Sequence, residues 1–411
     1  MTLGAKGPDM ANSQARSRGI AVPAAVPRYD VDLYGDDVIA EPYGHYRAIR
    51  DLGPVVYLPK NDLWAVGRYD DVRTVLRDHA IFSSAKGIAA NATVNDTSTG
   101  NTITSDPPDH TVMRGVIRAP LTVPALKHVE ARITAEAEAL VERLVAQRSF
   151  DVVADLARHL PVSIVSDLVG LPEEGRANML RWAAATFDVL GVMNARGLAA
   201  RGDVLELHAY CQDPATLRNL RSDGWAAAIW QAADRGEISR DKCPVMMRDY
   251  ISPSLDTTIF ATASLIWLLG INPDQWTRVR SNPALITPAI NEAIRLESPI
   301  RAFTRVAVRH CEIVGAQIPA GARLLVLYAS ANRDERRWKD PERFDVEREA
   351  QTHLGFGFGA HICAGMHLAR LEMTALLKAL AARVERFELG TPVWAQNNVL
   401  RGLASLPVRV H

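Results

Sequence analysis

The stretch Leu354-Gly-Phe-Gly-Phe-Gly-Ala-His-Ile-Cys-Ala-Gly-Met366 places alternating glycines and Cys363 directly before a helical pattern that runs from about Gly365 to Arg386. Glycine permits positive φ and lets the backbone approach a large flat group closely. A cysteine at the N-terminal end of a helix is favoured as a thiolate, because unpaired amides and the helix dipole stabilise negative charge. These features make Cys363 suited to act as an axial ligand of haem iron.

Two other interpretations of this stretch stay open at this point. A single cysteine near a helix start is often a buried apolar filler. A glycine-rich turn before a helix can also bind phosphate, but the Gly-Lys-Ser/Thr ending of a phosphate loop is missing here. The other cysteines, Cys211, Cys243 and Cys311, form no Cys-x-x-Cys pair, which argues against a disulfide framework or a zinc site.

The composition is that of a globular protein. The chain has 411 residues, of which 48% are hydrophobic, with 47 Lys+Arg balancing 47 Asp+Glu. This apolar content excludes global disorder, and the zero net charge argues against a binder of duplex DNA. The longest apolar run, residues 259–271, is too short to cross a bilayer, and residues 1–27 lack the apolar core of a signal peptide. We expect a cytoplasmic protein without membrane or nucleic-acid partners.

The hydrophobic periodicity predicts one mainly helical domain with small β-sheets. Short β-branched and aromatic runs indicate one small antiparallel sheet within residues 43–82 and a second within 306–328. Apolar residues spaced by three and four predict helices from about 124 to 296. We expect residues 1–27 to form a mobile tail and residues 28–411 to form a single catalytic domain.

The segment from Phe356 to Gly365 resembles the haem-binding signature of the cytochrome P450 family of monooxygenases. The resemblance covers about residues 40–411. It implies a triangular helical prism around a buried haem b, with Cys363 as the proximal iron ligand. It also places Phe356 and Gly357 beside the thiolate.

Two further motifs follow in the order of that family. Glu292 and Arg295 resemble its Glu-x-x-Arg pair, whose spacing puts both side chains on one helix face. The resemblance gives this pair a structural role, locking it to a segment around Arg333. The segment 106–114 resembles the part of the family that binds haem propionates. By this resemblance, the side chains that would surround the two haem propionates are His110 and Arg114 from this segment, together with Arg305 and His361 from later in the chain.

Residues 252–258 occupy the place of the oxygen-binding motif of the family's central helix. Asp256 and Thr257 match its acid–alcohol pair, which implies proton delivery during oxygen activation. Pro253 and Ser254 replace the usual Ala-Gly. A proline inside a helix removes a backbone donor, so we expect a break at this point.

Several strings resemble the bacterial branch that oxidises and O-demethylates para-substituted benzoates, among them 53–57, 330–334, 369–372 and 398–407. The substrate-pocket residues implied by position in that branch are Phe187, Leu190, Ser252, Ile300 and Phe303. Ser254 joins them as a candidate, because it adds an oxygen where the family motif has glycine.

One departure from that branch concerns charge. The segment 95–101 has no arginine to receive a benzoate carboxylate, while Asp249 lies one helical turn before Ser252. An acid there repels a carboxylate and suits a phenol, an amide or an amine. Arg301 could reverse this effect by pairing with a carboxylate, or it could neutralise Asp249.

The family resemblance implies insertion of one oxygen atom of O2 into a small organic, most simply aromatic, substrate. It also implies a monomer that receives electrons from a separate ferredoxin and its NAD(P)H-dependent reductase, with Arg118, Lys127 and Arg370 as candidate docking cations. Two alternatives stay open. The chain could tailor a larger natural product, with residues 212–223 as a lid, by hydroxylation or by coupling without oxygen insertion. It could also be a haem-thiolate sensor.

Overall fold

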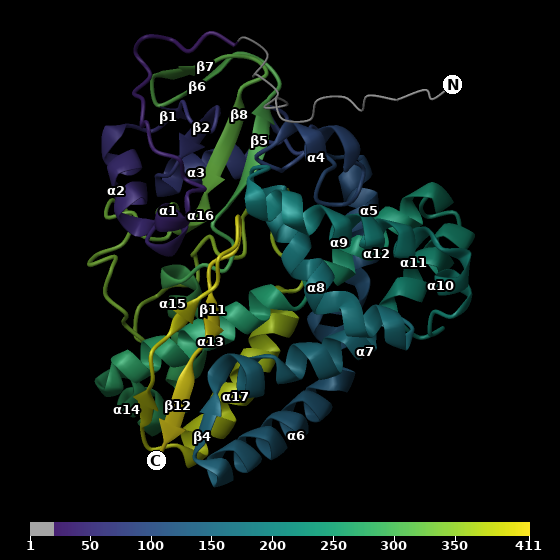
Figure 1. Ribbon diagram of the computed structural model, residues 1–411, viewed down its shortest axis with the longest axis vertical. Coiled ribbons are helices and arrows are strands. Elements are labelled where there is room, and N and C mark those ends of the chain that lie inside the picture. The colour runs from purple at the N-terminus through teal and green to yellow at the C-terminus, as the bar shows by residue number, and fades with distance from the viewer. Residues whose placement is uncertain (1–19) are drawn as a thin grey trace, which may run out of the picture.

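The computed structural model describes residues 20–411, and the expected mainly helical fold with small sheets is confirmed (Figure 1). Most of the predicted tail lies outside the described residues. Its predicted end at residue 27 is too late, because Val26 is buried and the carbonyl of Pro27 accepts a hydrogen bond from the amide of Tyr57 at 2.9 Å. The packed part of the chain therefore begins before residue 28.

The two sheets that the sequence predicted separately form one five-stranded sheet, ordered β1-β2-β8-β5-β3. Strand β2 pairs in parallel with β8, with Trp64 opposite Leu324, and the other pairs are antiparallel. Local sequence patterns cannot show this pairing, because the two halves are far apart in the chain. The strands are β1 (Val56–Leu58), β2 (Leu63–Val66), β3 (Phe82–Ser83), β5 (Ala302–Ala307) and β8 (Arg323–Leu327), with the hairpin β6 (Cys311–Ile313) and β7 (Ala316–Ile318) beside them.

The first helices flank this sheet and lead to the front of the helical region (Figure 1). They are α1 (Asp36–Ala40), α2 (Tyr43–Leu52), α3 (Tyr69–Arg77), α4 (Ala92–Thr97), α5 (Asp109–Arg118) and the 3₁₀ turn η2 (Ala119–Leu121).

The central part of the chain is helical, as predicted. Its elements are α6 (Val123–Gln147), the π-helical turns η3 (Val152–Ala157) and η4 (Pro161–Val165), α7 (Ser166–Val169), α8 (Glu173–Leu190), α9 (Ala195–Gln212), α10 (Pro214–Arg218), α11 (Trp225–Asp234), η5 (Arg240–Lys242), α12 (Cys243–Ile251), α13 (Asp256–Ile271), α14 (Pro273–Ser281), η6 (Pro283–Leu285) and α15 (Ile286–Leu296).

The C-terminal part returns to both regions. Its helices are α16 (Tyr328–Ala331), η7 (Gly359–His361) and α17 (Met366–Arg383), and its strands are β9 (Phe387–Leu389), β10 (Val393–Trp394), β11 (Leu403–Ser405) and β12 (Pro407–Val410). Strand β12 lies between β9 and β4 (Ser149–Asp151), and β10 pairs with β11.

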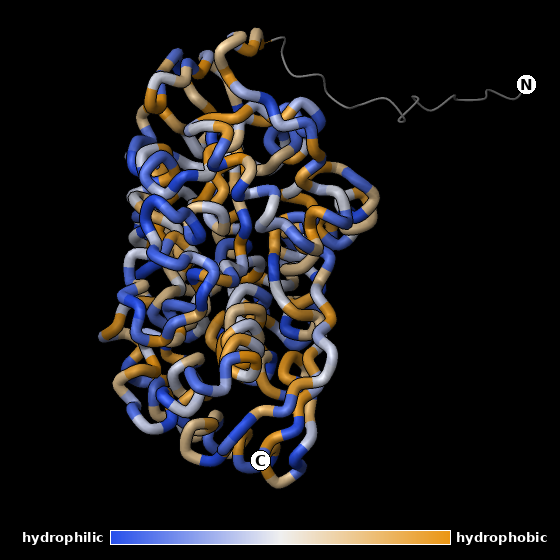
Figure 2. Tube along the Cα trace, turned by 90° about the vertical axis from the view of Figure 1, so that its left-hand side faces the viewer, coloured by the Kyte–Doolittle hydropathy of each residue, from blue (hydrophilic) through white to orange (hydrophobic). Residues whose placement is uncertain are grey.

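Helix α13 runs through the main hydrophobic core. Ile259, Ala263, Leu265 and Leu269, spaced around the helix, are all at most 1% exposed. A helix that is apolar on every side belongs inside a protein core. The stretch Arg240–Ile271 is long and apolar enough to cross a membrane, but 67% of its most apolar window is buried inside the protein. Figure 2 shows hydrophilic and hydrophobic residues interleaved along the chain, with no continuous hydrophobic band in that view.

Candidate functional site

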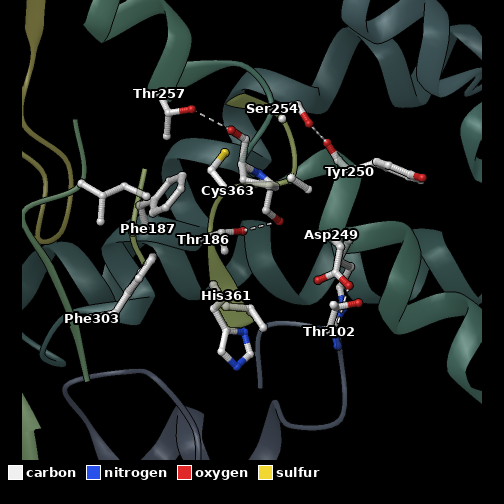
Figure 3. Close-up of a pocket in the computed structure, with 18 of the residues that line it drawn as sticks. Thr102, Thr186, Phe187, Asp249, Tyr250, Ser254, Thr257, Phe303, His361 and Cys363 are labelled. Carbon is white, nitrogen blue, oxygen red and sulfur yellow. Dashed lines mark hydrogen bonds between the residues drawn. The ribbon is translucent and has the colours of Figure 1, made fainter. Parts of the chain in front are cut away.

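A cavity of about 330 Å³ lies between α5, α8, α12, α13 and α17, and Cys363 is one of its lining residues (Figure 3). The Cys363 loop is held by its own backbone, because the Cys363 amide donates to the carbonyl of Phe356 at 2.8 Å. Gly357 and Gly359 adopt φ values of 72° and 73°, which favour glycine. A Cβ on Gly359 would lie 2.5 Å from the carbonyl oxygen of Leu76, so this turn requires glycine.

The electrostatic setting of Cys363 differs in part from the prediction. Burial raises the pKa of the thiol, and this effect exceeds the lowering by the backbone amides of Gly365 and Met366 and by the guanidinium of Arg114. The expected effect of the helix N-terminus is therefore present but smaller than desolvation. A bound metal cation provides the charge that makes such a thiol ionise.

Phe356 belongs to the cysteine loop and lines the same cavity as Cys363, and its ring is covered by the guanidinium of Arg370 at 4.9 Å. Arg370 also donates to the side chain of Asn291 at 3.0 Å. It is a packed side chain, so it does not suit the docking role that the sequence suggested.

Two imidazoles meet beside the cavity: His361 lines it, and His110, which is not among its lining residues, packs against His361. The rings of His110 and His361 lie 4.2 Å apart, and neither Nε2 atom has a hydrogen-bond partner within residues 20–411. Burial lowers the pKa of His110, and burial followed by the charge of Arg305 lowers the pKa of His361 to about 2. Both rings are thus neutral, with unpaired polar atoms in a buried place.

Two cationic side chains stand near the same edge. Arg305 is 3% exposed and donates to the carbonyl of Thr304 at 2.8 Å, and Arg114 donates to the carbonyl of Ile362. Both also line the cavity. Carboxylates at this edge would accept hydrogen bonds from both histidines and meet both arginines. The side chains present therefore fit a haem, with its propionates at this edge and its iron at Cys363.

The helix over the cavity is broken where the sequence predicted a break. Helix α12 ends at Ile251 and α13 begins at Asp256, with Pro253 between them. Two hydroxyls bond carbonyls in this gap: Thr257 donates to Pro253 at 2.9 Å, and Ser254 donates to Tyr250. Thr257 and Ser254 line the cavity.

Asp256 lies on a different side of α13 from the cavity and is not among its lining residues. It is 9% exposed, and its Oδ2 atom has no hydrogen-bond partner within the described part of the chain. Burial raises the pKa of Asp256 to about 7, against the lowering effect of Arg158. Asp256 and Thr257 thus lie on adjacent positions, with the alcohol in the cavity and the acid behind it.

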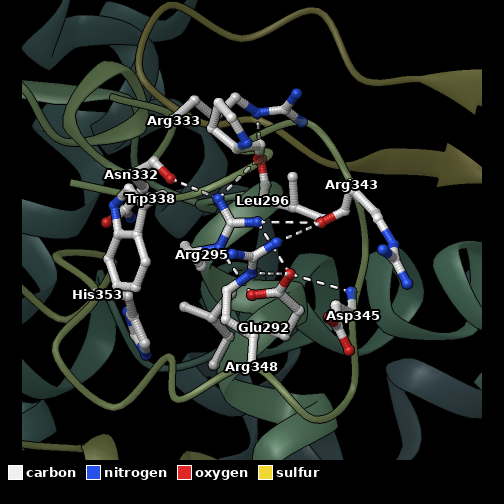
Figure 4. Close-up of polar contacts among 12 residues, drawn as sticks. Glu292, Arg295, Leu296, Asn332, Arg333, Trp338, Arg343, Asp345, Arg348 and His353 are labelled. Carbon is white, nitrogen blue, oxygen red and sulfur yellow. Dashed lines mark hydrogen bonds and ion pairs between the residues drawn. The ribbon is translucent and has the colours of Figure 1, made fainter. Parts of the chain in front are cut away.

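The predicted Glu292–Arg295 pair forms the centre of a buried polar network (Figure 4). Two hydrogen bonds of 2.7 and 2.9 Å join the side chains, and both are 0% exposed. Arg295 also donates to the carbonyl of Asn332 at 2.7 Å, and Arg348 donates to Glu292 at 2.9 Å. The pair thus fastens α15 to the segment that precedes the cysteine loop.

Arg333 lies next to Asn332, whose carbonyl Arg295 binds, and has ion-pair partners of its own. It pairs with Glu297 at 2.8 Å and donates to the carbonyl of Leu296 at 3.0 Å. The ring of Tyr43 lies 3.5 Å from its guanidinium carbon. Arg333 therefore holds the end of α15 and α2 together beside the Glu292–Arg295 network.

The substrate-pocket residues fall into two groups. The cavity is lined, as predicted, by Phe187, Leu190, Asp249, Ser252, Ser254, Ile300 and Phe303. Arg301 is not among the lining residues, and its guanidinium donates to the carbonyls of Asn397 and Asn398 at 3.3 and 2.6 Å. Arg301 therefore cannot pair with a substrate carboxylate or neutralise Asp249. No residue of 212–223 lines the cavity, so the predicted lid is not placed over it.

Among the polar lining residues that the sequence interpretation missed are Arg248 and His208. Their side chains contact each other through Nη1 and Nε2. The charged dipeptide Arg248-Asp249 inside an otherwise apolar helix was the available signal for the first. No local signal marks the second, because it lies on α9, 40 residues earlier.

The fold and this site define a haem-thiolate protein. A Cytochrome P450 family model matches residues 270–406. The chain is 36% identical over 392 residues to cytochrome P450 CYP199A2 of Rhodopseudomonas palustris, covering 94% of this chain and 95% of that one. It is 32% identical over 400 residues to linalool 8-monooxygenase of Pseudomonas putida, covering 92% and 97% of the two chains.

Among solved structures, the fold is similar to cytochrome P450 CREJ in complex with (4-ethylphenyl) dihydrogen phosphate. The TM-score is 0.82 at 26% identity, with 91% of this chain and 98% of that chain covered. The chain belongs to the cytochrome P450 family, as the sequence resemblance predicted. It is a P450 monooxygenase, and haem b bound through a cysteine thiolate is the cofactor of this family.

Proposed function

We propose that this P450 inserts one oxygen atom of O2 into a small aromatic substrate, by hydroxylation or O-demethylation, with electrons from a separate ferredoxin. The observation that carries the proposal is the cavity itself, which is lined by Cys363, by the unpaired imidazole of His361 and by the rings of Phe187 and Phe303. The haem supplies the activation of O2 when it is bound.

The side chains of the protein would orient the cofactor and deliver protons. His110, His361, Arg114 and Arg305 would hold the propionates and so fix the orientation of the cofactor. Thr257 lines the cavity, and its hydroxyl, which donates its single proton to the carbonyl of Pro253, can donate into the cavity only by turning away from that carbonyl. Asp256, with a pKa of about 7, can both accept and release a proton near neutral pH, and so can resupply Thr257 from the far side of α13.

The shape of the cavity supports a small aromatic substrate. Phe187 and Phe303 lie on one side of it, so that a flat ring can pack against them (Figure 3). The strings that resemble the benzoate-oxidising branch, together with the identity to the Rhodopseudomonas protein, support the same class. The aryl group in the ligand of the CREJ complex is a further para-substituted ring accepted by a related fold.

The separate electron donor, a ferredoxin with its NAD(P)H-dependent reductase, is a further part of the proposal, and its support is the similarity of the chain to bacterial P450s. We further propose that the enzyme is a cytoplasmic monomer.

The test begins with the purified protein loaded with haem. We expect a thiolate-type band in the reduced, carbon monoxide-treated protein, and its loss in Cys363→Ser. With a surrogate ferredoxin, its reductase and NADH, we expect a 4-methoxy-substituted aromatic to yield formaldehyde or a hydroxylated product that contains one atom from labelled O2. A thiolate band without turnover of any single-ring aromatic would remove the substrate class. Absence of the band would remove the haem site.

A further inference from the structure

Two side chains of opposite charge lie next to each other on the cavity wall. Arg248 and Asp249 are consecutive residues of α12, and both line the cavity. Their charges act on each other, because the carboxylate raises the pKa of Arg248 and the guanidinium lowers that of Asp249. Burial lowers the pKa of Arg248 and raises that of Asp249, and each of these effects is larger than that of the neighbouring charge. This end of the cavity is therefore polar, with Arg248 and Asp249 compensating each other and Arg114 acting on Asp249 as a second cation.

Only part of the Asp249 carboxylate is used by the protein. Its Oδ2 atom accepts a hydrogen bond from the amide of Thr102 at 3.1 Å, which ties the loop before α5 to α12. Figure 3 shows the second oxygen turned away from Thr102 and toward the cavity. Asp249 is intermediate in exposure although it lies deep in the protein, because it borders the cavity. One carboxylate oxygen thus remains as an acceptor for a bound molecule.

Arg248 offers the complementary group. One of its terminal nitrogens contacts Nε2 of His208, and His208 is neutral because burial and the charge of Arg248 lower its pKa to about 4. A guanidinium has five N–H donors, so contact with one imidazole nitrogen leaves others for a ligand. The cavity wall therefore carries a donor and an acceptor side by side.

This pairing discriminates among small polar groups. A carboxylate can bind Arg248 but is repelled by Asp249, and an ammonium group meets the reverse problem. A phenol hydroxyl can satisfy one of the two side chains at a time through its single proton. A primary carboxamide has a carbonyl for Arg248 and an N–H for Asp249, and it carries no charge into the buried cavity.

We infer that Arg248 and Asp249 form a carboxamide-selective subsite, so that the substrate is an aromatic amide with its reacting substituent at the opposite end of the ring. This inference rests on the proposed function, since it names the substrate class for the same cavity. Phe187 and Phe303 lie across the cavity from Asp249, as Figure 3 shows, where they can hold the ring. Asp249 is here a specificity-determining residue.

The experiment uses the haem-loaded enzyme at pH 7.5. Dissociation constants of 4-methoxybenzamide, 4-methoxybenzoate and 4-methoxyphenol are measured by the spin-state shift of the ferric Soret band and by calorimetry. We expect the amide to bind at least tenfold more tightly than the benzoate and more tightly than the phenol. Asp249→Asn should reduce the preference for amide over benzoate at least fivefold, because it removes the repulsion of the carboxylate.

Asp241→Asn is the matched control, because it removes the same charge from an exposed position eight residues earlier. It should leave the preference unchanged. Equal binding of amide and benzoate, no binding of any of the three compounds, or an unchanged preference in Asp249→Asn would each overturn the subsite. A normal carbon monoxide band in the same samples would show that the haem-thiolate assignment stands when the subsite fails.

Discussion

The carboxylate of Glu292 is joined to the guanidinium of Arg295 by two hydrogen bonds, and neither side chain reaches solvent. The same guanidinium bonds the carbonyls of Asn332 and Pro341, so one side chain connects α15 to two places in the segment before the cysteine loop. Burying such a pair costs much desolvation free energy, and the pair is stable only while both partners are present.

Removal of one partner should therefore be severe. We predict that Arg295→Ala lowers the free energy of unfolding by roughly 3–5 kcal/mol and reduces haem retention, because the buried Glu292 loses one of its two guanidinium partners and keeps only Arg348. Arg278→Ala breaks a surface pair with Glu347 and should cost less than about 1 kcal/mol. Urea unfolding and haem content of both variants check this. Equal losses would show that burial does not determine the effect.

Thr257 should affect the coupling of electrons to product. We predict that Thr257→Ala still consumes NADH but diverts most of the electrons to peroxide, because the hydroxyl in the cavity is lost. Thr277→Ala is a close control, since Thr277 also donates to the carbonyl of a proline four residues earlier, at 3.0 Å, but on exposed α14. The test is the amount of product and of peroxide formed per NADH consumed in both variants. Unchanged coupling in Thr257→Ala would exclude a role of Thr257 in coupling electrons to product.

Asp256 should link activity and stability to pH. Its folded-state pKa of about 7 lies above the ordinary value of 3.8, so the unfolded chain loses this proton first as pH rises. Wild-type stability from this group therefore declines between about pH 4 and pH 7. We predict that Asp256→Asn is more stable than wild type at pH 8, by roughly 2–4 kcal/mol, and close to it below pH 4.

The same variant should turn over at least about tenfold more slowly, because it has no titratable proton. Urea unfolding at pH 4 and pH 8, with product formation at pH 7.5, tests both parts. A variant that is less stable than wild type at pH 8 would contradict the buried, unpaired carboxyl.

The binding of benzoates should improve in acid. Burial raises the pKa of Asp249 to about 6, so this group loses its charge as pH falls below that value. The other charged groups that act on it, Arg248 and Arg114, keep their charge, and His208 stays neutral above about pH 4. We predict tighter binding of 4-methoxybenzoate at pH 5.5 than at pH 7.5, with no such trend in Asp249→Asn. A flat pH profile in wild type would contradict it.

Gly359 should tolerate no side chain. Its φ of 73° disfavours any other residue, and an added Cβ would meet the carbonyl of Leu76 at 2.5 Å. Gly236 has a similar φ of 77° with open space around it, so Gly236→Ala isolates the conformational cost of about 1–2 kcal/mol. Gly359→Ala should exceed that cost and impair haem binding. Similar unfolding free energies would show that the contact with Leu76 relaxes freely.

The parts of the site that the sequence predicted correctly are those encoded in short segments. Cys363, Glu292 and Arg295, and the helix break at Pro253 each depend on spacing within one loop or helix. The predicted position of Arg301 was wrong. Side chains alternate along β5, so Phe303 and Arg305 both line the cavity, but β5 begins at Ala302 and the alternation does not include Arg301. At Arg301 the chain instead bonds the segment 397–399.

The contact between Arg248 and His208 could not be predicted, since it joins two helices whose packing depends on the whole fold. The five-stranded sheet could not be predicted for the same reason. The patterns at 56–66 and 323–327 correctly indicated strands, but strand pairing over such a separation depends on how the helices between them pack.

The parallel pairing of Trp64 with Leu324 has a consequence for synthesis of the protein. Strand β8 ends at residue 327 of 411, so β2 cannot pair with β8 until most of the chain has been synthesised. During that interval β1 and β2 can pair only with each other, and β2 lacks its second neighbour, β8. Contacts this distant in sequence slow folding and expose unpaired strands to aggregation. Production at low temperature with ample haem should therefore raise the yield of soluble enzyme.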